Sequence, residues 1–168
     1  GGKTDVVDRD SDWLVRVDSP RSWHRLATSL ASAMVGLGWS HCLLLHDGGS
    51  RGHLWAGQMS TLKCFRMEPF LAVADFTAFS RDGPRRFRSG FCECNLAGLE
   101  DFLVKQPQDG CSCGGRMISA DHVLPYAWCK AYKLSVPCPR LPVAVLEELY
   151  EVKDRCWALP IVTAKRAP

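Results

Sequence analysis

The chain has 168 residues, of which 46% are hydrophobic and 23% are charged, with a formal net charge of +3. This balance excludes a long disordered chain, a collagen and a coiled coil, and it favours a single domain over residues 1–168. The charge is too small to demand a nucleic acid or an acidic membrane as partner, and no apolar run approaches the roughly 20 residues of a membrane helix.

The first half of the chain, residues 1–91, is predicted to be an antiparallel sheet with one long amphipathic helix. Residues 12–18 alternate weakly and predict a strand. Ser19 and Pro20 supply an N-cap and a proline at the first helical position, and apolar residues at three- and four-residue steps predict a helix over 20–35. Four more segments predict strands, the first two as a hairpin: 39–46, 53–59, 70–79 and 86–92.

The second half, residues 92–168, is rich in cysteine and is predicted to be mainly helical. Asn95 predicts the cap of a short helix over 96–103, and Pro142 predicts the start of the last helix. A further helix is predicted over 127–133 and a closing strand over 157–162. The expected fold class is therefore α+β.

Nine cysteines are the most informative part of the composition. The count is odd, and residues 1–19 carry five aspartates and no apolar stretch of the kind found in secretory leaders. These features predict an intracellular, reducing compartment, the cytoplasm or the nucleus. Closely spaced cysteines in such a compartment more often bind a metal or take part in chemistry than form disulfides.

Two Cys-x-Cys pairs predict a zinc site. The four candidate ligands are Cys92, Cys94, Cys111 and Cys113. Zinc prefers four soft ligands in a tetrahedron, and two short-spaced pairs on turns can supply them. A zinc ion there would pin the second half of the fold at both ends of the segment between the pairs. Three further residues could replace one ligand: His122, Cys129 and Cys138. A dry cysteine core and a redox pair remain alternatives.

A second hypothesis is catalytic and uses His41, His53 and Cys94. One histidine would act as a general base, the other would orient it, and a thiol at the start of a helix would be activated by the helix dipole. The run from His41 to Leu54, with the later cysteine, resembles the LRAT-like H-box/NC family, which includes acyltransferases, phospholipases and the 2A proteins of some picornaviruses. The resemblance implies His41 as base, His53 as orienting residue and Cys94 or Cys92 as nucleophile. The plainer interpretation is a pair of hairpin histidines without catalytic function.

A cluster of basic residues marks the turn between the predicted strands over 70–79 and 86–92. We call it the arginine turn: Arg81, Arg85, Arg86 and Arg88, together with Phe87. Arginine beside an exposed aromatic ring can pair with phosphate and stack on a base, so this turn predicts a contact with RNA or with a protein. The alternative is a solvated hairpin tip.

The leading functional hypothesis is a zinc-stabilised, non-catalytic interaction or regulatory module that binds a protein or RNA partner. The rival hypothesis is a cysteine-dependent hydrolase or acyltransferase of the H-box/NC type. The two hypotheses exclude each other at Cys94, because a thiolate that binds zinc is not a free nucleophile.

Overall fold

The computed structural model describes residues 10–46, 54–55, 58–68, 72–94, 111–131 and 134–150. Within these ranges the side chains of residues 10, 46, 91–94, 111–113 and 131 are not described. The chain divides into two compact units: the first comprises residues 1–80 and 89–115, and the second comprises residues 81–88 and 116–168. The predicted helix over 96–103 and the predicted strand over 157–162 lie outside the described residues.

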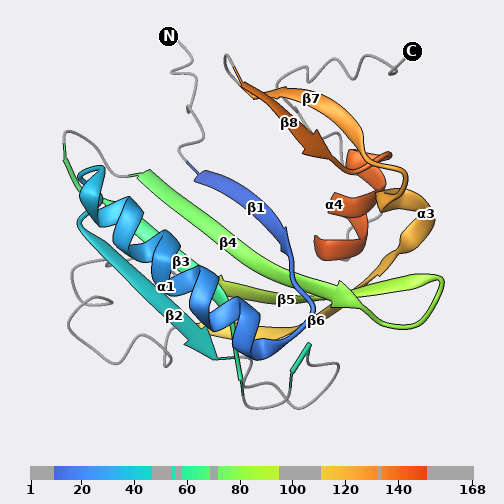
Figure 1. Ribbon diagram of the computed structural model, residues 1–168, viewed down its shortest axis with the longest axis horizontal. Coiled ribbons are helices and arrows are strands. Elements are labelled where there is room, and N and C mark those ends of the chain that lie inside the picture. Colours follow the sequence, from blue (N-terminus) through green and yellow to red (C-terminus); the bar gives the residue numbers. More distant parts are fainter. Residues whose placement is uncertain are drawn as a thin grey trace, which may run out of the picture. The chain divides into compact units, whose positions relative to one another are not determined.

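A curled, mainly antiparallel sheet of six strands dominates the fold (Figure 1). Its strands are β1 (Asp10–Arg16), β2 (His41–His46), β3 (Met59–Arg66), β4 (Ala72–Arg81), β5 (Arg86–Cys94) and β6 (Cys111–Ser119). The order is β2-β3-β4-β5-β6, and β1 pairs in parallel with β4. The predicted α+β class and the predicted sheet with one long helix are confirmed.

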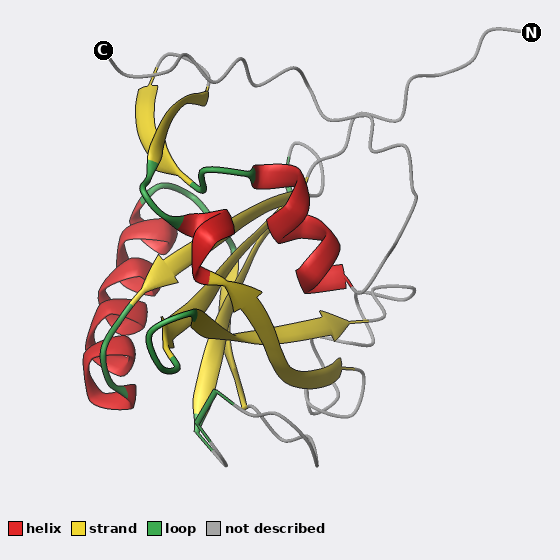
Figure 2. Cartoon of the chain, turned by 90° about the vertical axis from the view of Figure 1, so that its right-hand side faces the viewer, coloured by secondary structure: helices red, strands yellow, loops and turns green. Residues whose placement is uncertain are grey.

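Helix α1 (Pro20–Gly36) covers one face of the sheet in the first unit (Figure 2). Ser19 is its N-cap and accepts a hydrogen bond of 3.1 Å from the backbone N–H of Ser22, as the Ser-Pro start predicts. Trp23 and Ala27 point into the core and are fully buried against β3 and β4. The sequence prediction of this helix is confirmed to within a residue.

Strand β3 is the most deeply buried element of the first unit, because both of its faces are covered. On one face Leu62 and Cys64 join the core beneath α1. On the other face Lys63 forms a buried ion pair with Asp75, the residue opposite it on β4. The predicted partner strand of the hairpin, over 53–59, is wrong: the strand that pairs with β2 begins at Met59.

The second unit contains a two-stranded hairpin and two short helices: β7 (Ala127–Ala131), β8 (Leu134–Cys138), α3 (Ala120–Val123) and α4 (Pro142–Tyr150). Helix α4 starts at the predicted proline and buries Val145 and Leu149. The helix predicted over 127–133 is wrong, since residues 127–131 form β7, and the described part of the cysteine-rich half is not mainly helical. No helix in the described ranges is long and apolar enough to cross a bilayer.

Two disulfides contradict the predicted reducing compartment. Cys42 and Cys64 are joined at directly opposite positions of β2 and β3, and Cys129 is joined to Cys138 across the β7–β8 hairpin. Disulfides persist in oxidising environments such as the extracellular space. The prediction of a cytoplasmic or nuclear location is therefore wrong. It rested on the odd number of cysteines, which does not prevent two pairs of them from forming disulfides when the fold brings them together.

Candidate binding site at the arginine turn

The arginine turn is a tight connection between β4 and β5. The backbone N–H of Asp82 donates a hydrogen bond of 3.0 Å to the carbonyl of Arg86 and so closes the turn. Gly83 has a φ of +78°, a conformation that side chains with a Cβ rarely adopt. At the start of β5, the carbonyl of Arg85 accepts a hydrogen bond of 2.9 Å from the N–H of Ala120, which anchors the backbone of the turn within the second unit.

Two of the four arginines stabilise the turn itself. The guanidinium of Arg81 lies 4.6 Å from the centre of the Phe87 ring and donates a hydrogen bond of 2.8 Å to the carbonyl of Pro84. Arg88 donates two hydrogen bonds, of 3.0 and 2.7 Å, to one carboxylate oxygen of Asp82. These arginines therefore hold the conformation of the turn, and their charges are already balanced or covered.

The other two arginines, Arg85 and Arg86, are exposed at the rim of a cavity. Neither has an ion-pair partner in the part of the chain that the structure describes. The phenyl ring of Phe87, by contrast, is fully buried. It cannot stack on an RNA base, so the exposed aromatic side chain expected beside these arginines is missing.

The cavity at the arginine turn has a volume of about 350 Å³. Its lining residues are Arg85, Arg86, Met117, Ile118, Ser119, Asp121 and Glu148. The two arginines thus share the cavity with Met117, a half-buried apolar residue of β6, whereas its neighbour Ile118 is fully buried. A cavity with cations at the rim and apolar surface within suits a ligand that carries both a negative charge and carbon-rich groups.

Glu148 fixes the far wall of the cavity. Its Oε2 atom accepts a hydrogen bond of 3.0 Å from the N–H of Ser119 and lies 3.2 Å from Nδ1 of His122. The Nδ1 contact is close but lacks hydrogen-bond geometry. The Nε of Arg116 donates a hydrogen bond of 3.0 Å to the carbonyl of Leu149, which holds α4 against β6. The wall is therefore formed before any ligand binds.

The four cysteines of the predicted zinc site occupy two neighbouring strands. Cys92 and Cys94 lie at the end of β5, and Cys111 and Cys113 lie at the start of β6. Their side chains are outside the described residues, and among described side chains no group of three or more could hold a metal ion. Four thiolate ligands require reducing conditions, whereas the disulfides indicate oxidising ones. Zinc therefore has no part in the function proposed below.

The three residues that could replace one zinc ligand all lie in the second unit. Cys129 and Cys138 are joined to each other and offer no thiolate. His122 faces Glu148. Each of the three is thus already engaged in the second unit.

We expect the cysteines of the native protein to be oxidised in β5 and β6 as well. The antiparallel contact from Ala120 to Arg85 places the end of β5 beside the start of β6, so the two Cys-x-Cys pairs lie on adjacent backbone segments. Thiol titration and metal analysis of native protein should find no reactive thiol at these four positions and no stoichiometric zinc. Peptide mapping without reductant should recover the Cys42–Cys64 and Cys129–Cys138 links as internal controls. One zinc per chain, with four thiols that react only after chelation, would restore the zinc hypothesis.

The residues of the catalytic hypothesis are not brought together among the described side chains. His41 is exposed at the start of β2, opposite Phe65. His53 and the side chain of Cys94 lie outside the described residues. The neighbour of His41, Cys42, is held in a disulfide. The catalytic hypothesis thus stays a prediction of the sequence.

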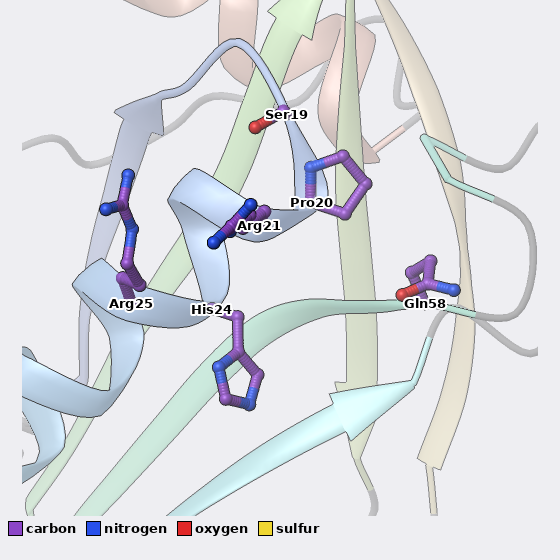
Figure 3. Close-up of a pocket in the computed structure, with 6 residues that line it drawn as sticks. All are labelled: Ser19, Pro20, Arg21, His24, Arg25 and Gln58. Carbon is purple, nitrogen blue, oxygen red and sulfur yellow. The ribbon is translucent and has the colours of Figure 1, made fainter.

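A second basic site was missed by the reading of the sequence. Arg21, His24 and Arg25 lie on the first two turns of α1, at the rim of another cavity in the first unit (Figure 3). The available signal is their spacing of three and four residues, which places them on one helix face, together with the lack of an acidic residue in the first turn. The helix is predicted from its N-terminal cap and its apolar face, and no prediction is made for its basic residues.

Comparisons of the chain with protein-family models, with curated proteins and with solved structures gave no match. Its function is therefore argued from its own residues.

Proposed function

We propose that this chain is a disulfide-bonded, non-catalytic binding module that holds an acidic segment of a protein partner at the arginine turn. The observation that carries the proposal is the pair of exposed arginines, Arg85 and Arg86, which lack an ion-pair partner among the described residues and border a cavity. The other two arginines of the turn hold its shape. The site is thus a rigid turn that presents two free cations.

The chemistry of the pair favours carboxylates. Guanidinium groups bind carboxylates through two parallel hydrogen bonds, and the rigid fork loses little freedom when it binds. Asp121 and Glu148 on the same cavity would repel a ligand that is acidic throughout. A segment with one or two acidic residues beside apolar ones fits this cavity, since the half-buried Met117 supplies apolar surface next to the two arginines.

A protein partner fits this unit better than RNA does. Single-stranded RNA is bound where exposed aromatic rings beside the cations stack on bases, and the aromatic ring of the arginine turn, Phe87, is fully buried. The same unit exposes Tyr126 and Trp128, at 41% and 55% of their surface. Tryptophan and tyrosine are enriched among the residues that dominate protein interfaces. The oxidising environment indicated by the disulfides also favours a protein partner.

Binding of a labelled peptide tests the proposal. The probe is a fluorescein-labelled peptide in which glutamates alternate with leucines, and affinity is measured by fluorescence anisotropy. Arg85→Ala/Arg86→Ala should raise the dissociation constant about 10- to 100-fold, because each charged hydrogen bond contributes about 1–2 kcal/mol at an exposed rim. The matched control, Arg21→Ala/Arg25→Ala, removes the same net charge from the other unit and should leave the affinity unchanged.

Three results would contradict this function. Equal loss of affinity in the two double variants would mean that net charge alone attracts the peptide. An unchanged affinity in Arg85→Ala/Arg86→Ala would show that the turn is not the site. Tighter binding of a single-stranded RNA of equal length than of the peptide would favour a nucleic-acid partner instead.

A further inference from the structure

The first unit has a larger cavity at the start of α1, which we call the α1 cavity. Its volume is about 720 Å³. It is lined by Ser19, Pro20, Arg21, His24, Arg25 and Gln58. Figure 3 shows the helix residues on one side and Gln58, which precedes β3, on the other. The cavity is thus formed between a helix and the entry to the most buried strand, two elements whose positions the core fixes.

The α1 cavity is basic. Arg21, His24 and Arg25 are all exposed, and no acidic residue is among the lining residues. Neither Arg21 nor Arg25 has an ion-pair partner in the part of the chain that the structure describes. Side chains four residues apart on a helix lie about 6 Å from each other, so the two guanidinium groups can contact neighbouring anionic groups of a single ligand.

The placement of these charges works against the helix itself. Cations near a helix N-terminus oppose the macrodipole, and α1 has no acidic residue in its first turn to compensate. The N–H of Ser22 is already taken by the Ser19 hydroxyl, so a ligand would contact the side chains rather than the helix end. Residues that oppose the local preference of a helix, such as cations at its N-terminus, are found most often at functional sites.

We propose that the α1 cavity binds the sulfate-ester groups of an acidic polysaccharide. The arginines pair with the sulfates, and the hydroxyl- and amide-bearing Ser19 and Gln58 suit the sugar hydroxyls. No large hydrophobic side chain lines this cavity, in contrast to Met117 at the arginine turn, so an apolar peptide finds little surface here. No phenylalanine, tyrosine or tryptophan lines it either, so the large rings on which nucleic-acid bases stack are missing from the lining.

The oxidised state of the chain is the second line of support. The disulfides Cys42–Cys64 and Cys129–Cys138 indicate an oxidising environment, and sulfated polysaccharides are abundant in the extracellular space. This inference does not depend on the function proposed for the arginine turn, because the lining residues of the two cavities are entirely different.

Calorimetric titration with a heparin-derived hexasaccharide tests the proposal on the full chain. We expect Arg21→Ala/Arg25→Ala to weaken binding about tenfold or more and to lower its dependence on salt, since fewer counterions are released. Arg85→Ala/Arg86→Ala, which removes the same charge, should bind as the unchanged protein does. The desulfated hexasaccharide should not bind. Because the α1 substitutions remove cations from the positive end of a helix, the double variant should melt at the same temperature or slightly higher.

The proposal is overturned if both double variants lose affinity equally, or if the α1 variant loses none. It is also overturned if inorganic sulfate alone displaces the hexasaccharide at equal concentration of sulfate groups, which would indicate a simple anion site. Equal affinity for a single-stranded RNA with the same number of charges would identify general attraction of polyanions. If Arg21→Ala/Arg25→Ala fails to fold, Arg21→Gln/Arg25→Gln preserves side-chain bulk and answers the same question.

Discussion

Replacing Lys63 with methionine is expected to lower the free energy of unfolding by about 3–5 kcal/mol. Lys63 and Asp75 are opposite each other on β3 and β4, and their side chains are only 5% and 10% exposed. Removal of the ammonium takes the Lys63 partner away from a buried carboxylate, and a buried charge is costly unless it is paired. Urea denaturation followed by circular dichroism measures the loss. Asp75→Asn should have an effect of similar size.

Two further variants distinguish the cost of leaving one charge unpaired in the core from the cost of losing the ion pair itself. Lys63→Met/Asp75→Leu removes both charges together and should recover most of the stability, because replacement of a whole buried ion pair by apolar groups is often neutral. Arg88→Met breaks the half-exposed ion pair with Asp82 and should cost no more than about 1 kcal/mol. If Lys63→Met costs as little as Arg88→Met, β3 is not buried on both faces in solution.

Introducing a single methyl group at Gly90 of β5 is expected to cost about 3 kcal/mol, through overpacking. A Cβ built at this position would lie 2.3 Å from the Oγ and 2.4 Å from the Cβ of Ser60, closer than real atoms approach. Both residues are buried, so neither side chain can swing into solvent. The Gly90→Ala variant is therefore expected to show a lower midpoint in urea than the unchanged protein.

A second substitution, at Ser60, should relieve the clash with the added methyl group. In Gly90→Ala/Ser60→Gly the nearest remaining atom is the backbone oxygen of residue 60, at 3.3 Å, so the double variant should regain a large part of the lost stability. Gly36→Ala is the matched control, because nothing lies within 4 Å of its added Cβ. It should be neutral or stabilising by up to about 1 kcal/mol. Equal effects of Gly90→Ala and Gly36→Ala would contradict the close approach of β5 to Ser60.

The predictability of the fold differs sharply between α1 and β3. Helix α1 can be predicted from the N-cap Ser19, from Pro20 and from its apolar face. The residues of that face are the ones that pack into the core. Strand β3 is buried on both faces and therefore lacks the alternation that marks a half-exposed strand. Lys63 lies in the centre of β3, and a lysine in a sequence predicts a solvent-exposed position. Its partner Asp75 is twelve residues away and is found only from the fold.

The candidate sites were partly visible in the sequence. The arginine turn could be found from its charge density, and Arg85 and Arg86 are exposed as expected. The burial of Phe87 follows from strand alternation, because residues 86 and 88 point to the opposite face of β5. The α1 cavity could not be predicted from the sequence, because Gln58, one of its lining residues, comes from a segment more than thirty residues downstream of the helix start.

The parallel pairing of β1 with β4 has a consequence for synthesis of the chain. Asp10 is opposite Val73, so β1 has to wait for its partner strand β4 until β2, β3 and β4 have all been made. Such long-range pairings form late and leave an open strand edge in the meantime. Asp10 and Asp12 place negative charge on β1 while it is unpaired, and this charge disfavours its pairing with the sheet edge of another molecule.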